Sequence, residues 1–395
     1  MKKSLLAVAA MTAFAGAAQA QSSVTVYGIL DVGYIGGNNR GFTATGNTQK
    51  ATYNSFGSSA ESTSRLGFKG NEDLGGGMAA FFTVELAVTP NSAAATTGGT
   101  NRQAFVGVSK KGTGNVAIGT QYTVIHTAVG ATDPGQQNNM VGNVIYPIAP
   151  GNNGNTVGSN SAIAGTNQDA TNTGGYTVRT NNMLKVQTDK FAGFQGTAFY
   201  TMANQDNTQN NATSGGQNDK NGWGVGINYN WQKLLVTANY QSLKANQPTA
   251  TTSAAALFTP WTAQSTASNV QDNQQYYAAT YDFGILKAYA QYINRKVTSE
   301  ITPNVYLQRS AQQIGVRSFI TPKIEAWASG GTGRFDSIQA ETVNFTGYQL
   351  GSNYWLSKRT NLYAIFGSTQ QSSSSLATQP SSGANNYALG VRHTF

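Results

Sequence analysis

The sequence predicts an all-β fold, an antiparallel transmembrane β-barrel of sixteen strands. Apolar and polar residues alternate along most of the chain, which is the period of a strand with two different faces. Short and long connections alternate between these segments, as in barrels with tight turns at one end and long loops at the other. Only 10% of the residues are charged, against about 25% in typical globular domains, so an ordinary soluble fold is disfavoured.

Residues 1–20 have the three parts of a secretory signal peptide. Lys2 and Lys3 supply positive charge, an apolar stretch follows, and residues 18–20 (AQA) form a cleavage site of small residues. The apolar stretch is too short to cross a membrane as a helix. The prediction is therefore a signal peptide at 1–20 and an exported barrel domain at 21–395.

The expected strands are about ten residues long, which suits a tilted strand that crosses the bilayer. In the first strand Val24, Val26 and Leu30 share one face, whereas Thr25 and Asp31 share the other. The sixteen expected strands lie near residues 23–36, 64–72, 76–88, 101–110, 114–122, 175–187, 193–202, 221–231, 233–243, 273–283, 284–297, 310–320, 323–334, 342–356, 359–370 and 385–395.

The connections decide in favour of a closed barrel. Seven of them are short and eight are long, which places both termini at the end with the short turns. Closure also leaves no open sheet edge, and lipid offers no partners for unpaired backbone groups. The long connections are residues 37–63, 89–100, 123–174, 203–220, 244–272, 298–309, 335–341 and 371–384.

No group of residues points to catalysis or to metal binding. The chain has no cysteine and only two histidines, so it lacks the usual zinc-ligand patterns. His126 falls in the third long connection and His393 in the last strand, so they are poor partners for one Ser-His-Asp site. We therefore expect no enzyme activity, no cofactor and no metal.

Charged side chains on the inward face carry the functional signal. A ring of like charge at a narrow place in a channel selects the ions that enter. Arg65, Arg102 and Arg179 fall on the second, fourth and sixth expected strands, around the root of the third long connection. The full set of candidate pore residues is Arg65, Arg102, Arg179, Lys69, Lys185, Arg317, Asp31 and Glu85, with Arg40 after the first strand and Asp133 in the third long connection.

Four segments of the chain resemble the general porins of Gram-negative bacteria, of the betaproteobacterial type. They are residues 22–33 (SSVTVYGILDVG), 64–84 (SRLGFKGNEDLGGGMAAFFTV), 101–119 (NRQAFVGVSKKGTGNVAIG) and 387–395 (YALGVRHTF). The resemblance implies a homotrimer of sixteen-stranded barrels in the outer membrane. It also implies passive diffusion of small hydrophilic solutes, and a third loop, here about 123–174, that folds into each lumen.

The resemblance also bears on single residues. Arg65 and Arg102 lie inside matching segments, which supports their place in the constriction. Enteric porins have an acidic cluster in the third loop, but this loop has only Asp133 and Asp169, which favours anions. At the C-terminus, a final aromatic residue with apolar residues at alternate positions resembles the recognition signal for the barrel assembly machinery; those positions are Phe395, Val391, Leu389 and Tyr387.

The basic character of the chain does not indicate nucleic-acid binding. Its net charge of +9 becomes +7 without Lys2 and Lys3, and the longest basic runs are only Lys110-Lys111 and Lys358-Arg359. Nucleic-acid binding needs a basic stripe or run. The distributed excess bears instead on ion selectivity and on contact with lipopolysaccharide.

The sequence as a whole predicts an outer-membrane porin, a water-filled channel for small hydrophilic solutes and ions with a modest preference for anions. One alternative is a channel specific for a carboxylate or phosphate solute, with the same arginines as the binding track. A second alternative is an adhesin-like barrel, in which the long connections 37–63 and 244–272 would do the work.

Overall fold

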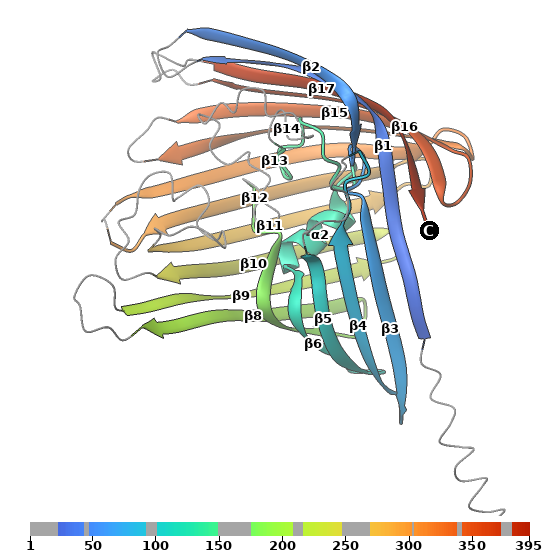
Figure 1. The fold of residues 1–395 in the computed structure, drawn as a ribbon, viewed down its shortest axis with the longest axis vertical. Helices are drawn as coiled ribbons and strands as arrows, with labels where there is room; N and C mark the ends of the chain where they lie inside the picture. Colours follow the sequence, from blue (N-terminus) through green and yellow to red (C-terminus); the bar gives the residue numbers. More distant parts are fainter. Residues whose placement is uncertain are drawn as a thin grey trace, which may run out of the picture.

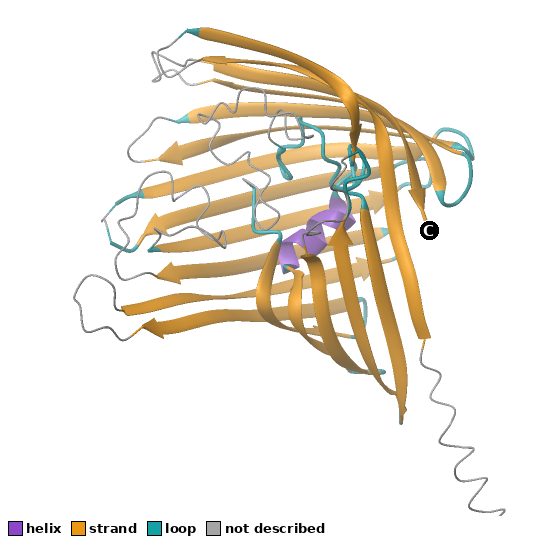
Figure 2. Ribbon diagram, viewed as in Figure 1, coloured by secondary structure: helices purple, strands orange, loops and turns teal. Residues whose placement is uncertain are grey.

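A computed structural model describes residues 23–42, 47–91, 101–148, 175–207, 216–246, 269–301, 304–337, 342–372 and 381–395. These residues form one antiparallel sheet that curls into a barrel, with one helix inside the ring of strands (Figures 1 and 2). The elements are β1 (Ser23–Phe42), β2 (Thr48–Ser58), β3 (Arg65–Gly75), β4 (Met78–Ala87), β5 (Asn101–Lys110), β6 (Gly114–Tyr122), α2 (Val124–Thr132), β7 (Arg179–Thr188), β8 (Phe194–Asn207), β9 (Gly216–Trp231), β10 (Leu234–Asn246), β11 (Val270–Asp282), β12 (Lys287–Ser299), β13 (Tyr306–Phe319), β14 (Ile324–Ser337), β15 (Val343–Trp355), β16 (Thr360–Ser372) and β17 (Ser381–Thr394).

The first strand closes the barrel. β1 pairs with β17 on one side, and on the other side it pairs with β3 through its first residues and with β2 through its later ones. β2 and β3 are therefore two halves of one barrel strand, and the 17 segments of the sheet make 17 − 1 = 16 barrel strands. The predicted closed, sixteen-stranded antiparallel barrel is confirmed.

The first long connection is shorter than expected. Residues 37–63 were expected to form a loop, but β1 continues to Phe42 and β2 covers Thr48–Ser58, with Gly37 opposite Tyr53. Asparagine and glycine interrupt the apolar alternation there, so the pattern that indicates a lipid-facing strand is missing. Between β2 and β3 the chain leaves the sheet at Ser59, whose φ is +67°, and Ala60 is fully buried.

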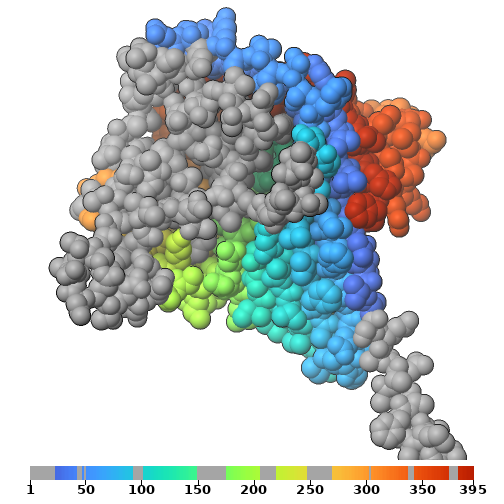
Figure 3. Space-filling view, in the orientation of Figure 1, coloured from blue at the N-terminus to red at the C-terminus, as the bar shows by residue number. Residues whose placement is uncertain are grey.

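The outward face of the barrel is apolar. Val24 and Val26 are 68% and 53% exposed, whereas the inward Asp31 has no exposed surface. On β9 the exposed residues Trp223, Val225 and Ile227 continue this apolar face. The space-filling view shows β3 to β6 forming a continuous outer wall (Figure 3). A sheet that exposes its apolar side chains and buries its polar ones fits a lipid environment.

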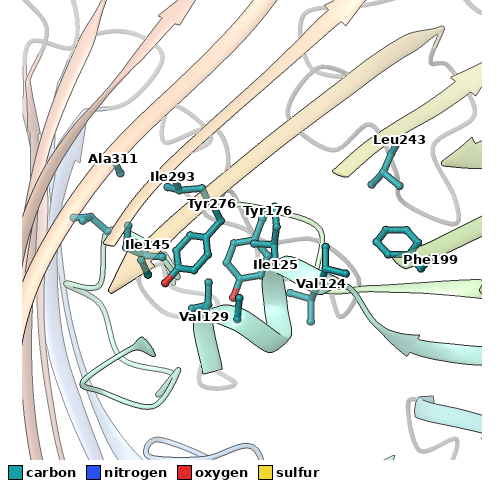
Figure 4. Packing of buried hydrophobic residues seen from close by; sticks show 14 of the residues in the cluster. Val124, Ile125, Val129, Ile145, Tyr176, Phe199, Leu243, Tyr276, Ile293 and Ala311 are labelled. Atoms are coloured by element: carbon teal, nitrogen blue, oxygen red, sulfur yellow. The ribbon is translucent and has the colours of Figure 1, made fainter. Parts of the chain in front are cut away.

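No helix among the described residues is long and apolar enough to cross a membrane. The helix α2 instead packs on the inner side of the wall. It starts directly after β6, and Thr123 caps its first turn by accepting a hydrogen bond from the His126 backbone N–H, at 3.3 Å. Its apolar residues meet the wall in one buried cluster, in which Val124, Ile125, Val129, Phe199, Leu243 and Tyr276 take part (Figure 4).

The chain after α2 is held by hydrogen bonds to distant strands. Asn138 and Gln349 of β15 exchange two amide hydrogen bonds, at 2.9 and 3.1 Å. The backbone N–H of Val144 donates to Gln313 of β13, at 3.1 Å. The described residues 123–148 therefore contact several sectors of the inner wall. Residues 149–174 of the predicted third loop lie outside the described residues, so the folding of the complete loop stays a prediction.

Both ends of the barrel domain meet at one edge. The N–H of Gly28 donates to the carbonyl of Phe395, and the N–H of Phe395 donates to the carbonyl of Gly28, both at 3.1 Å. The turn from β3 to β4 runs through three consecutive glycines, the last residue of β3 and the two that follow it, with φ of +80°, +58° and +75°, a backbone region that glycine adopts without strain. The predicted signal peptide, residues 1–20, lies outside the described residues and stays a prediction.

Candidate functional site

Three arginines from alternate strands converge on one cavity. Arg65 of β3, Arg102 of β5 and Arg179 of β7 line a cavity of about 470 Å³ on the inner wall. Residues of α2 and of the chain that follows it also line this cavity. Its other lining residues are Ser62, Thr63, Ala87, Tyr122, His126, Thr127, Gly130, Gln136, Gln137, Asn139, Tyr146 and Val178.

Glu85 of β4 holds two of the arginines. The Arg102 Nε atom donates to the Glu85 Oε1 atom at 2.7 Å, and Arg65 Nη1 lies 3.9 Å from the same oxygen. The hydroxyl of Tyr27 donates to the other carboxylate oxygen of Glu85, at 3.1 Å. Because charge-assisted hydrogen bonds are stronger than neutral ones, this arrangement fixes Arg102 in one orientation.

Further contacts restrain the three arginines. Arg102 Nη2 donates to the hydroxyl of Tyr122 at 2.6 Å, and the Arg179 guanidinium lies 5.8 Å from the centre of the same ring. Arg65 Nε donates to the carbonyl of Thr63 at 2.8 Å. The inward segment between β2 and β3 thus helps to position Arg65. Three guanidinium groups therefore gather at this wall, and the carboxylate of Glu85 pairs with Arg65 and Arg102.

Aromatic rings from β6, from α2 and from the chain after α2 lie at this cavity. The rings of His126 and Tyr122 are 4.4 Å apart, and Tyr146 and Tyr176 lie 6.0 and 5.9 Å from His126. Burial, and then the positive charges of Arg179 and Arg102, lower the pKa of His126 well below its ordinary value. Burial also raises the pKa values of Tyr146 and Tyr176. These groups are therefore neutral near pH 7 and do not offset the charge of the arginines.

Asp133 and Arg317 lie elsewhere in the lumen. Asp133 is buried and accepts hydrogen bonds from the Gln137 backbone N–H, at 2.6 Å, and from the Asn143 side chain, at 3.0 Å. Burial raises the pKa of Asp133. Arg317 Nη2 pairs with Glu325 at 2.7 Å, and its Nη1 donates to the carbonyl of Pro134 at 2.7 Å. These two groups anchor the chain after α2 to β13 and β14.

The other candidate pore residues do not line the cavity. Asp31 is buried and accepts hydrogen bonds from Tyr363, Ser62 and Glu61, at 2.6, 2.6 and 2.8 Å, so it is a structural acceptor. Lys69 is exposed, with its Nζ 5.5 Å from the centre of the Tyr27 ring. Lys185 donates to the Tyr122 carbonyl at 3.0 Å, and Arg40 is exposed near the end of β1. The structure thus brings together Arg65, Arg102, Arg179 and Glu85.

Sequence reasoning did not single out Tyr122, although it touches two of the three arginines. Its position as the last residue of β6, directly before the third long connection, is a signal that could have found it. Reasoning from the sequence also missed the pair of Arg295 with Asp272, at 2.7 Å. These are inward residues of the neighbouring strands β11 and β12, diagonal to each other in register, and opposite charges on such cross-strand neighbours are a recognisable pattern.

The C-terminal strand presents its apolar residues outward. Phe395, Leu389 and Tyr387 are 42%, 57% and 42% exposed, and Val391 is half-buried. This is the lipid-facing series that the sequence predicts. Its role as an assembly signal stays a prediction. No group of three or more potential metal ligands of the types His, Cys, Asp and Glu occurs among the described residues.

A closed barrel with an apolar outer face and a charged, polar inner wall defines a pore-forming protein of a membrane. The particular family follows from the sequence as a whole, because the family model of the Gram-negative porins matches residues 7–374. The chain belongs to this family. It is therefore a channel protein of the outer membrane, and family and fold indicate a channel rather than an enzyme.

Two curated relatives are themselves named as outer membrane porins. An outer membrane porin protein of Bordetella pertussis is 28% identical over 430 residues, which cover 100% of both chains. Outer membrane porin protein 32 of Delftia acidovorans is 48% identical over 87 residues, 22% of each chain.

Two solved structures share the fold. The anion-selective porin from Comamonas acidovorans superposes with a TM-score of 0.66 at 21% identity, over 95% of this chain and 100% of its own. The trimer form of OmpT from Vibrio cholerae has a TM-score of 0.59 at 16% identity, over 95% and 99% of the two chains.

Proposed function

We propose that this outer-membrane channel admits small hydrophilic solutes by passive diffusion and prefers anions modestly. The observation that carries the proposal is the convergence of Arg65, Arg102 and Arg179 on one cavity, where Glu85 pairs with Arg65 and Arg102. Arginine stays charged at any working pH. A fixed positive charge in a narrow, low-dielectric passage raises the local concentration of anions and repels cations.

The third loop would set the size limit of the channel. Its described part presents neutral aromatic rings toward the arginines, with His126 4.4 Å from Tyr122. Asp133, the first acidic residue of this loop, is buried and accepts hydrogen bonds from amides. Its carboxylate therefore does not line the cavity. The result is an uneven passage, with positive charge on one side and uncharged groups on the other. Such a passage attracts anions without neutralising the arginines on the opposite wall.

The proposal includes the partners that the family implies. These are two further copies of the chain in a homotrimer, outer-membrane lipid with lipopolysaccharide, and the barrel assembly machinery. The trimer form of OmpT from Vibrio cholerae, which shares the fold, agrees with a trimer. Chemical crosslinking of the purified protein in detergent tests this part, with a trimer expected and a monomer as the contradicting result.

Single-channel recording in a planar bilayer tests the proposal. Under a gradient of potassium chloride, the reversal potential should show chloride more permeant than potassium. A ratio of one or below would contradict the anion preference. The absence of conductance would instead support the adhesin-like alternative.

A channel specific for a carboxylate or phosphate solute is the second candidate. The cavity of about 470 Å³ with its three arginines is large enough to hold a small organic anion, which favours this reading. Block of the chloride current by micromolar amounts of a small dicarboxylate or of inorganic phosphate would support it. Unhindered current at millimolar solute would support the general channel.

A further inference from the structure

Arg309 of β13 is a buried cation that forms no ion pair with an acid among the described residues. Its side chain is 3% exposed and lies against the rings of Phe335 and Phe345, with its guanidinium carbon 5.5 and 4.7 Å from the ring centres. One of its terminal nitrogens, Nη2, donates to the carbonyl of Val144. The other, Nη1, is buried and has no hydrogen-bond partner. The ion pairs of the described residues do not include Arg309.

The neighbouring charges do not compensate Arg309. The residue opposite it in register on β12 is a second cation, Arg295. Arg295 is already paired with Asp272, at 2.7 Å, so this neighbouring pair is neutral as a unit. An uncompensated buried charge costs several kcal/mol, and proteins rarely keep one without a counter-charge. The aromatic rings offset part of this cost, but they do not neutralise the charge.

A second unpartnered polar atom belongs to a residue that lines the same cavity as Arg309. Arg309 borders a cavity of about 40 Å³, together with Ser382 of β17 and the chain around Asn143 and Val144. The Oγ atom of Ser382 is buried and has no hydrogen-bond partner either. A site for one water needs only about 10–15 Å³ by a comparable measure. The cavity therefore has room for one small ion or one water molecule that could accept hydrogen bonds from both Arg309 and Ser382.

We propose that this cavity binds one small anion of the size of chloride, which accepts hydrogen bonds from Arg309 Nη1 and Ser382 Oγ. A water molecule would fill the space, but it would leave the charge of Arg309 unbalanced. A large organic anion does not fit the volume. The bound anion connects β13 and β17 with the chain at Val144, so it holds this part of the third loop against the wall. The site is separate from the arginine cluster, with which it shares no lining residue.

Anomalous diffraction from crystals soaked in bromide tests the site directly. We expect a bromide peak within hydrogen-bond distance of Arg309 Nη1, and its loss in Arg309→Met. A peak that persists in Ser329→Ala is the matched control, because Ser329 Oγ is also buried and unpartnered but does not line this cavity. Bromide at other places only, or an acidic side chain or a water next to Nη1, would overturn the proposal.

Thermal unfolding in detergent gives a second test that does not depend on Arg309→Met folding. At constant ionic strength, replacing gluconate with chloride should raise the unfolding temperature of the wild type in a saturable way. Ser382→Ala should need about tenfold more chloride for half of the effect, since it removes one hydrogen bond to an ion. Ser329→Ala should behave as the wild type. Equal chloride dependence in both serine variants would overturn the proposal.

Discussion

Glu85 and Arg102 form an ion pair on neighbouring strands of the inner wall, with Arg102 Nε 2.7 Å from Glu85 Oε1. The same oxygen lies 3.9 Å from Arg65, so one carboxylate restrains two guanidinium groups of like charge. Arg179 adds a third cation at the same cavity. Glu85 therefore keeps mutually repelling side chains in place but does not cancel their field.

Removing the charge of Glu85 should increase anion preference and reduce stability. In Glu85→Gln the two arginines lose their shared partner, and breaking a buried pair costs about 3 kcal/mol. The reversal potential in a salt gradient and the unfolding temperature in detergent measure the two effects. Glu72→Gln is the matched control, because Glu72 is an exposed acid on β3. A variant with wild-type stability and selectivity would refute the role of Glu85.

The two hydrogen bonds between Asn138 and Gln349 should restrict the motion of the chain after α2. Gln349→Ala leaves the buried Asn138 amide without these partners, at a cost of about 1–3 kcal/mol. We expect larger fluctuations of the open-channel current in single-channel recordings. Gln312→Ala is the control, because Gln312 is exposed on the outer face of β13. Current noise as low as in the wild type would show that these bonds do not hold the loop.

The folded protein should lose stability below about pH 6.5 through His126. Burial and the nearby arginines lower the pKa of His126 well below 6.5 in the folded state, whereas the unfolded chain takes up the proton near 6.5. The unfolded state then binds more protons as the pH falls, which costs at most about 1.4 kcal/mol per pH unit. The free energy of unfolding of His126→Gln should fall less between about pH 7 and pH 5. Equal slopes for the two proteins would contradict the account.

Deletion of Phe395 should impair assembly in cells more than folding in the test tube. Phe395 closes the barrel through two backbone hydrogen bonds with Gly28, and it is 42% exposed on the outer face. If its ring also serves as an assembly signal, the deletion should lower the amount of heat-modifiable protein in the outer membrane several-fold. Refolding from urea into detergent should be reduced much less. If the yield fell equally in cells and in refolding, Phe395 would have a structural role only, and the assembly-signal prediction would be wrong.

The barrel was largely predictable because lipid imposes a strict pattern on each strand. Val24, Val26 and Leu30 alternate with polar residues, and this alternation gave the face and the start of β1, but not its end at Phe42. β2 was missed because residues 48–58 lack a regular apolar alternation. The same reason explains why β9 starts at Gly216, five residues before the expected strand.

The candidate site was predictable only in part. Register arguments place Arg65, Arg102 and Arg179 on one sector, and the structure does bring them to one cavity. They cannot show that Glu85 contacts two of them, because that depends on the side-chain rotamers. Nor does the sequence show that the Asp133 carboxylate is hydrogen-bonded to amides outside the arginine cavity, since that depends on the path of the chain after α2.

The permeability ratio of chloride to potassium in Arg65→Gln/Arg102→Gln tests the central claim most directly. The ratio, measured from the reversal potential under a potassium chloride gradient, should fall toward one, since two of the three cavity cations are removed. Arg40→Gln/Lys69→Gln removes the same amount of charge from exposed positions that do not line the cavity, and it should keep the wild-type ratio. An unchanged ratio in the arginine pair, or an equal change in both double variants, would contradict the assignment of anion preference to this cluster.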